Sequence, residues 1–311
     1  MAFVFPGQGS QRRGMGQGLF DEVPEFRDAE QEVDAILGYS VRRLCLEDPD
    51  NLLKETQYTQ PCLYVVNALH SYKMISQEGS PEFVAGHSLG EYNALLTAGA
   101  FDFLTGLRLV QKRGALMAQI KNGGMAAVLG LDMERILSLI RESGLSRLDV
   151  ANINSPSQIV LSGPATEIEK AKSVFEASGA RMFMPLAVSA AFHSRYMVEV
   201  GQKFDAFLAS FAFRETKIPV ISNVTGKPYP QDATTTGPLL VMQISQPVQW
   251  TKSIHFLLRT GVSCFREAGP GNVLTRLVQQ IGKEVTDHNQ IHARDELAKG
   301  ISAKDPAHGN S

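Results

Sequence analysis

Cysteine, tryptophan and long apolar runs are scarce in this 311-residue chain, which has three cysteines and one tryptophan. Cys45, Cys62 and Cys264 lie far apart and show no metal-ligand spacing, so we expect reduced core thiols rather than a disulfide framework or a metal site. No stretch approaches the length of a membrane span, and the apolar run after Met1 is too short for a signal peptide. We therefore expect a cytoplasmic protein.

An excess of charge of either sign is also missing, because the formal net charge is −2. Without a global basic field the chain has no electrostatic means of holding nucleic acid or an anionic membrane, so we expect neither partner. Long repeats and low-complexity tracts are absent as well. The apolar content of 43% is ample for a core, and the length suits one large domain or two smaller ones.

Short apolar runs alternate with amphipathic stretches over most of the chain, a pattern that predicts an α/β domain with a mostly parallel sheet. The predicted strands are residues 2–5, 83–85, 218–222 and 263–268. The predicted helices are residues 24–37, 60–77, 104–120, 251–260 and 273–284.

The segment 123–188 has a different order of elements. Strands near residues 125–131, 148–152, 158–162 and 181–188 and helices near 133–142 and 165–178 give the order βαββαβ. That order is typical of a ferredoxin-like subdomain. We therefore predict a hydrolase-like large domain of residues 1–122 and 189–285, with residues 123–188 as an inserted subdomain. Residues 286–311 are polar, and we expect a tail or linker there.

Gly86-His87-Ser88-Leu89-Gly90 is the most informative motif. An apolar strand precedes it and a helical run follows it, which is the context of a nucleophile elbow. The glycines allow a sharp reversal, and the amides that follow the serine can stabilise an oxyanion at a helix N-terminus. A chance GxSxG in a turn is the alternative, but the elements on both sides favour a nucleophile.

A serine nucleophile needs a base, and His193 is the best-placed of the seven histidines. It follows the inserted subdomain directly, at a junction that is expected to border a cleft. His87 is too constrained within the elbow, and His70 and His255 fall in predicted helices. The remaining histidines belong to the polar tail: His288, His292 and His308.

Arg113 is placed in the middle of the apolar face of its predicted helix, together with Met117. A guanidinium stays charged and is costly to bury without a partner. Its partner could be an internal carboxylate or the carboxylate of a substrate. The sequence leaves both readings open.

The turn after the first strand, Pro6-Gly7-Gln8-Gly9, resembles a phosphate-binding loop only superficially. Arg12 occupies the place of the third glycine of a dinucleotide fingerprint, and no Gly-Lys-Ser/Thr follows. Such a turn can instead offer a free backbone amide to an active site.

Five motifs follow one another along the chain: Phe5-Pro-Gly-Gln-Gly-Ser-Gln, Gly86-His-Ser-Leu-Gly-Glu, Gln111-Lys-Arg-Gly-Ala-Leu-Met, Ala191-Phe-His-Ser and Gly269-Pro-Gly-Asn-Val-Leu-Thr. Together, and in this order, they resemble the malonyl-CoA:acyl carrier protein transacylase family. The resemblance runs from Ala2 to about Ile281. Within the family, the motifs Thr56-Gln-Tyr-Thr-Gln-Pro and Asn152-Ile-Asn-Ser-Pro-Ser-Gln are most like free-standing acyltransferases that serve polyketide synthases in trans.

The resemblance implies an S-malonyltransferase that takes malonyl-CoA as substrate and an acyl carrier protein as partner, in polyketide or fatty-acid synthesis. We expect a monomer with no cofactor and no metal. The resemblance implies that Ser88 is the nucleophile and that His193 is the base and then the acid. The backbone amides of Gln8 and Leu89 would form the oxyanion hole, and Gln243 would support the histidine. The substrate would be bound by Arg113, Met117 and Phe192. In that family the residue before the histidine, here Phe192, marks a preference for malonyl over methylmalonyl groups, so the resemblance implies that preference.

Three other functions remain open. An acyl hydrolase that clears carrier proteins would use the same serine and histidine, although a buried Arg113 disfavours neutral acyl chains. A general α/β-hydrolase lacks an evident acid between Ser88 and His193. A catalytically inactive docking module would not need Ser88, His193 and Arg113 together.

Carrier proteins are usually acidic, so a basic patch is expected beside the cleft. Arg12, Arg13 and Arg195 are candidates for it.

Overall fold

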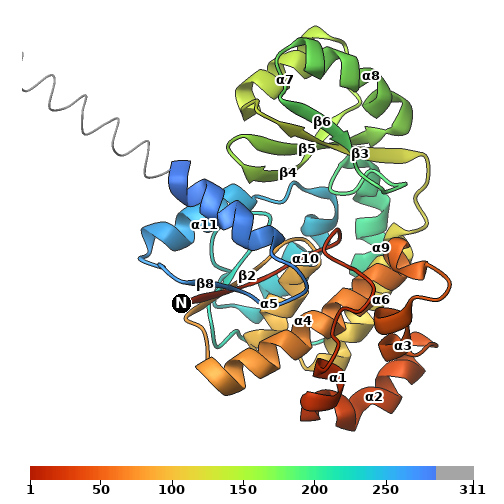
Figure 1. The fold of residues 1–311 in the computed structure, drawn as a ribbon, viewed down its shortest axis with the longest axis vertical. Helices are drawn as coiled ribbons and strands as arrows, with labels where there is room; N and C mark the ends of the chain where they lie inside the picture. Colours follow the sequence, from red (N-terminus) through yellow and green to blue (C-terminus); the bar gives the residue numbers. More distant parts are fainter. Residues whose placement is uncertain (285–311) are drawn as a thin grey trace, which may run out of the picture.

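A computed structural model describes residues 1–284, in which a larger α/β unit carries a smaller unit at one end (Figure 1). The sheet of the larger unit has four parallel strands in the order β7-β2-β1-β8. These strands are β1 (Ala2–Phe5), β2 (Phe83–Gly86), β7 (Val220–Ile221) and β8 (Phe265–Glu267). Phe5 is in register with Gly86, so the carboxyl ends of β1 and β2 lie side by side. In open parallel sheets, ligands bind beyond this edge.

Strand β1 shows why this sheet is covered on both faces. Its side chains alternate between two apolar clusters, with Phe3 and Phe5 in one and Ala2 and Val4 in the other. Helix α11 and the helical residues 273–284 cover the second face. All other helices of the larger unit lie outside that second cluster, and most contribute to the first.

The helices of the larger unit extend over much of the described chain. They are α1 (Leu19–Glu22), α2 (Pro24–Leu37), α3 (Val41–Glu47), α4 (Thr56–Glu78), α5 (Gly90–Thr97), α6 (Phe103–Met117), α9 (Val198–Leu208), α10 (Thr236–Ser245) and α11 (Trp250–Arg259). Three short 3-10 turns join them: η1 (Leu52–Lys54), η2 (Arg195–Met197) and η3 (Ala233–Thr235). None of the helices within residues 1–284 combines the length and apolarity that a membrane span requires.

The smaller unit is an antiparallel sheet with two helices on its outer face (Figure 1). Its elements are β3 (Gly123–Leu129), α7 (Met133–Glu142), β4 (Asp149–Ser155), β5 (Gln158–Pro164), α8 (Ala165–Ala177) and β6 (Met182–Pro185). Ala126 and Val128 of β3 pack against the helices, whereas Met125 and Ala127 join the core of the larger unit. The inner face of this sheet therefore packs against the larger unit.

The predicted fold class is confirmed, since a parallel sheet with a nucleophile turn carries a βαββαβ unit with the strand order β4-β5-β3-β6. Several predicted details were wrong. The strand predicted at 218–222 is only Val220–Ile221, because Pro219 has no N–H to donate to a neighbouring strand. Helix α10 was not predicted, although its Pro238 lies in the first turn, where a proline is tolerated. Cys264 is exposed rather than a core thiol.

Candidate active site

Ser88 lies at the sharp turn between β2 and α5. Its φ of 50° places it in the left-handed region, which a serine adopts only when the surrounding structure requires it. A Cβ on Gly86 would lie 1.9 Å from the carbonyl carbon of Gly90, and one on Gly90 would lie 2.0 Å from the carbonyl oxygen of Phe5. Both glycines are therefore needed for the chain to reverse here and to present the serine at the edge of the sheet.

His193 lies within hydrogen-bonding distance of Ser88, with 2.7 Å between Nε2 and Oγ. Its other nitrogen, Nδ1, lies 2.8 Å from the main-chain oxygen of Gln243. A carbonyl can only accept, so Nδ1 carries the hydrogen and Nε2 is free to accept the serine proton. Burial, and then the charge of Arg113, lower the pKa of His193 to about 3. The imidazole is therefore neutral at neutral pH, as a general base must be.

Arg113 reaches the same serine from α6 and is 1% exposed. Its Nη2 donates to Ser88 Oγ and to Gln243 Oε1, at 3.0 Å each, and its Nη1 donates to Gln60 Oε1 at 2.7 Å. The guanidinium also lies over the ring of Tyr92, with 5.6 Å to the centroid. All of these partners are neutral.

A buried cation without a direct carboxylate partner is the feature that decides between the two readings of Arg113. Within residues 1–284, no carboxylate lies at ion-pair distance from this guanidinium. Burial lowers the pKa of Arg113, but a guanidinium remains charged. The positive charge is therefore available to an anionic group that enters beside Ser88.

Two backbone amides beside Ser88 have no partner of their own. Neither the N–H of Leu89 nor that of Gln8 donates to another residue in the described part of the chain, and both residues line the cavity that contains Ser88 Oγ. By contrast, the N–H of Ser88 donates to Asn223 Oδ1 at 2.7 Å. The turn that carries Gln8 approaches closely, since a Cβ on Gly7 would lie 2.4 Å from the carbonyl oxygen of His87. This arrangement can supply two donors to an oxyanion.

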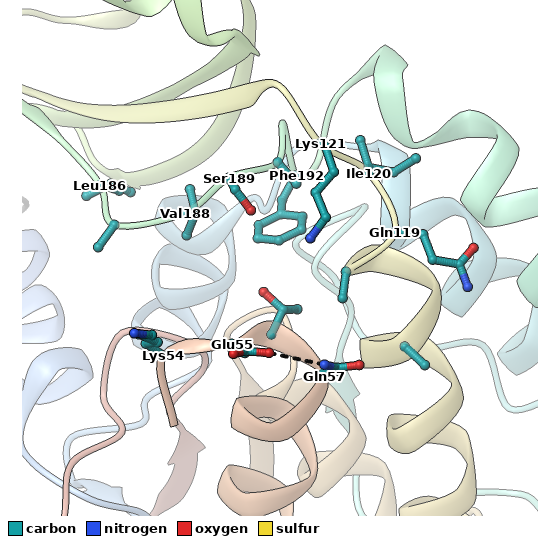
Figure 2. A pocket seen from close by; sticks show the side chains of 15 residues that line it. Lys54, Glu55, Gln57, Gln119, Ile120, Lys121, Leu186, Val188, Ser189 and Phe192 are labelled. Carbon is teal, nitrogen blue, oxygen red and sulfur yellow. Dashed lines mark hydrogen bonds between the residues drawn. The ribbon is translucent and has the colours of Figure 1, made fainter. Parts of the chain in front are cut away.

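The cavity consists of a small inner chamber and a wide outer cleft. The chamber, of about 80 Å³, contains Ser88 and His193 and is also lined by Met117. The cleft, of about 920 Å³, lies between the first turn of α4, the end of α6 and the segments 119–121 and 186–192 that connect the two units. Phe192 lines both, and Figure 2 shows its ring and the side chain of Lys121 pointing into the cleft. A long arm can therefore extend through the cleft while a small acyl group occupies the chamber.

The structure brings together all eight side chains and amides that the sequence analysis singled out: Gln8, Ser88, Leu89, Arg113, Met117, Phe192, His193 and Gln243. The support for His193 is the main-chain carbonyl of Gln243, while the side-chain amide of Gln243 contacts Arg113. No His/Cys/Asp/Glu cluster suited to a metal ion occurs within residues 1–284.

Some residues of the site were missed in the sequence. Gln60 holds Arg113, Asn223 anchors the turn at Ser88, and Asn154 holds His87 Nε2 at 2.8 Å. Asn152 lines the chamber, and its Oδ1 has no hydrogen-bond partner. Composition and periodicity do not reveal the roles of these polar residues, because their neighbours in space are distant in sequence. Gln60, Asn152 and Asn154 do fall within the motifs at 56–61 and 152–158 that carry the family resemblance. Glu91 did carry a local signal, as a charged residue at the start of an otherwise apolar helix.

The basic residues proposed for a patch beside the cleft differ in their availability. Arg12 and Arg13 are exposed. Arg195 forms an ion pair with Asp149, so its charge is already partnered.

Fold and site together define an acyl transferase of the type with an elbow serine. Residues 2–302 match the family model for the acyl transferase domain, so the chain belongs to this family. It is 54% identical over 286 residues to the polyketide biosynthesis malonyl CoA-acyl carrier protein transacylase PksC of Bacillus subtilis, covering 91% of this chain and 98% of that protein.

Solved structures show the same fold. A malonyl CoA-acyl carrier protein transacylase from Burkholderia pseudomallei has a TM-score of 0.86 and 48% identity, covering 91% of this chain and 97% of that one. A malonyl-transacylase in complex with its type II polyketide synthase acyl-carrier protein has a TM-score of 0.84 and 36% identity, covering 90% and 92%. The resemblance found in the motifs thus extends over the whole fold.

Proposed function

We propose that this chain transfers a malonyl group from malonyl-CoA to the phosphopantetheine thiol of an acyl carrier protein. The observation that carries this proposal is the buried Arg113, which lies 3.0 Å from Ser88 Oγ and contacts only neutral groups. A cation in this position selects an acyl group that ends in a carboxylate. The names of the relatives agree with this choice of substrate and acceptor.

In the first step, Ser88 Oγ attacks the thioester carbon of malonyl-CoA while His193 Nε2 takes the serine proton. The N–H groups of Leu89 and Gln8 hold the resulting oxyanion, and one such donor contributes about 3–4 kcal/mol to catalysis. The C–S bond then breaks, and His193 returns the proton to the sulfur of CoA. A malonyl ester remains on Ser88.

In the second step, the phosphopantetheine thiol attacks the ester carbon and His193 takes the thiol proton. The C–O bond to Ser88 breaks, and the serine recovers a proton from His193. Because the first product leaves before the second substrate reacts, the kinetics are ping-pong. The wide cleft has room for the arm of CoA or of the carrier protein.

Two side chains select the acyl group. Arg113 binds the free carboxylate of malonate, and the ring of Phe192 crowds the position of an α-methyl group. An acyl group with one carboxylate and no branch suits a chamber of about 80 Å³.

We further propose that the chain is cytoplasmic and supplies a polyketide synthase in trans. The chain is 54% identical to a polyketide biosynthesis transacylase but 39% identical to the malonyl CoA-acyl carrier protein transacylase of Synechocystis, and this difference supports the polyketide role.

The proposal is tested by intact-mass measurement after incubation with malonyl-, acetyl- or methylmalonyl-CoA. We expect a malonyl adduct that is absent in Ser88→Ala and weak with the other two donors. An equal yield of all three adducts would contradict the selectivity, and no adduct with a quick release of free malonate would indicate a hydrolase.

A further inference from the structure

A fully buried carboxylate lies behind the chamber and has no direct contact with the substrate position. Glu91, in the first turn of α5, is 0% exposed. Its Oε1 accepts from the hydroxyl of Tyr229 at 2.7 Å and from the N–H of Asn223 at 3.1 Å. Its Oε2 accepts from Nε2 of Gln243 at 2.5 Å. Three donors surround the carboxylate, and none of them is charged.

The Gln243 side chain connects this carboxylate to Arg113. Its Nε2 donates to Glu91 Oε2 and to the main-chain oxygen of Ser88, and its Oε1 accepts from Arg113 Nη2. A carboxylate only accepts and a guanidinium only donates, so the amide fits between them in one orientation. The main-chain carbonyl of the same residue holds His193 Nδ1. Glu91 therefore acts, through one residue, on both functional groups beside the nucleophile.

We infer that Glu91 is a positioning residue for acyl transfer, whose ionised carboxylate orients Gln243 and thereby holds Arg113 and His193 against Ser88. This inference rests on the proposed function, because Arg113 matters only if the acyl group is anionic. Glu91 touches no reacting atom. Gln243 transmits its effect to Arg113 and His193, and Asn223, whose N–H donates to Glu91 and whose side chain accepts from the N–H of Ser88, connects it to the turn of the nucleophile.

The ionisation of Glu91 makes its role visible in the pH dependence of the malonyl-transfer rate. Burial raises its pKa to about 7, although Tyr229, Gln243, Asn223 and Arg113 favour the ionised form. Below that pH the added proton occupies one acceptor position of the carboxyl, and the neutral group holds its three donors less strongly than the carboxylate does.

The titratable groups that face Glu91 do not change charge in the same range. They are Arg113 on α6, Tyr92 on α5, and Tyr229 beyond β7; the pKa of Tyr92 and that of Tyr229 are raised by burial. His193 has a pKa of about 3. The rate of malonyl transfer should therefore rise with pH through about 7, and Glu91 is the group responsible.

The test compares Glu91→Gln with the wild-type enzyme. The new amide oxygen can accept from Tyr229 and Asn223, but the new NH₂ faces the NH₂ of Gln243. Gln243 must then turn its amide and lose Arg113. We expect kcat/KM for Ser88 acylation by malonyl-CoA to fall roughly 10–100-fold, as for one lost hydrogen bond to a charged group, with a smaller fall for acetyl-CoA. The rise of the malonyl-transfer rate with pH near 7, which we call the limb of the pH profile, should disappear.

Tyr229→Phe provides a second variant in case Glu91→Gln fails to fold. It removes one donor from the ionised carboxylate and leaves Gln243 in place, so the limb should move to higher pH. Tyr64→Phe is the matched control, because the hydroxyl of Tyr64 donates to the carbonyl of Phe103 on another side of the core and the limb should stay in place.

Either of two results overturns the inference: a folded Glu91→Gln enzyme with wild-type malonyl rates, or a limb that does not move in Tyr229→Phe. The two proposals fail separately. If wild-type enzyme forms no malonyl ester on Ser88, the proposed function is wrong, whereas an ester whose formation is independent of Glu91 contradicts only this inference.

Discussion

Arg113→Ala tests the assignment of substrate class most sharply. The change removes a buried cation from the chamber and leaves the acceptor oxygens of Gln60 and Gln243 without their donor. The vacated space adjoins the chamber, so water can enter and donate to both oxygens. We therefore expect a folded protein with an altered preference for acyl groups.

The size of the effect follows from the pairing that malonate would lose. Removing one partner of a buried, hydrogen-bonded charge pair costs about 2–5 kcal/mol. A value near the middle, about 3–4 kcal/mol, corresponds to a fall of about 10²–10³-fold in kcat/KM for malonyl-CoA. Acetyl-CoA has no carboxylate to lose, so its rate should change by less than about tenfold.

The assay is the initial rate of Ser88 acylation with each donor, followed by mass. Arg108→Ala is the matched control, because Arg108 lies on the same helix, is 44% exposed and pairs with Glu32 at the surface. It should leave the preference unchanged. If Arg113→Ala is folded and still prefers malonyl-CoA as strongly as wild type, the role given to Arg113 is wrong.

Three further predictions concern selectivity, folding and stability. Phe192→Ala should raise the methylmalonyl-to-malonyl rate ratio about tenfold, because it removes the ring beside the α-carbon, and an unchanged ratio would contradict that role. Gly86→Ala should yield no folded protein by circular dichroism, since its Cβ would lie 1.9 Å from the carbonyl carbon of Gly90; a native melting curve would contradict the geometry. Burial raises the pKa of Glu91 from 4.5 to about 7, so the protonated form is favoured in the folded state and stability is lost as pH rises through 7. Urea unfolding should show the wild type losing about 3 kcal/mol relative to Glu91→Gln between pH 4.5 and 8, and a constant difference would contradict it.

Much of the fold could be predicted because its signals are local. The alternation of apolar runs and amphipathic helices identifies the α/β class, and the βαββαβ order within 123–188 identifies the inserted unit. The short strand β7 and helix α10 were missed or misjudged, because a proline interrupts each pattern and tertiary packing decides the outcome. The exposure of Cys264 could not be predicted from the sequence either, since it depends on which strand lies at the edge of the sheet.

The residues of the site likewise divide into those that a local sequence signal identifies and those that it does not. Ser88 lies in a local motif, and Arg113 is recognisable as a charge on an apolar helix face. The partners that orient them, among them Gln60 and Asn223, come from segments far away in the chain and contribute one polar atom each. No pattern of spacing reveals the roles of such residues, because only the tertiary fold brings them to the edge of the sheet where Ser88 lies.

The most direct test of the account is the fate of isolated malonyl-enzyme. The protein is loaded with malonyl-CoA, freed of CoA, and divided between buffer and a phosphopantetheinylated acyl carrier protein. The account predicts that the ester on Ser88 persists in buffer and passes quickly to the carrier thiol. Release of free malonate at the same rate in both portions would contradict it.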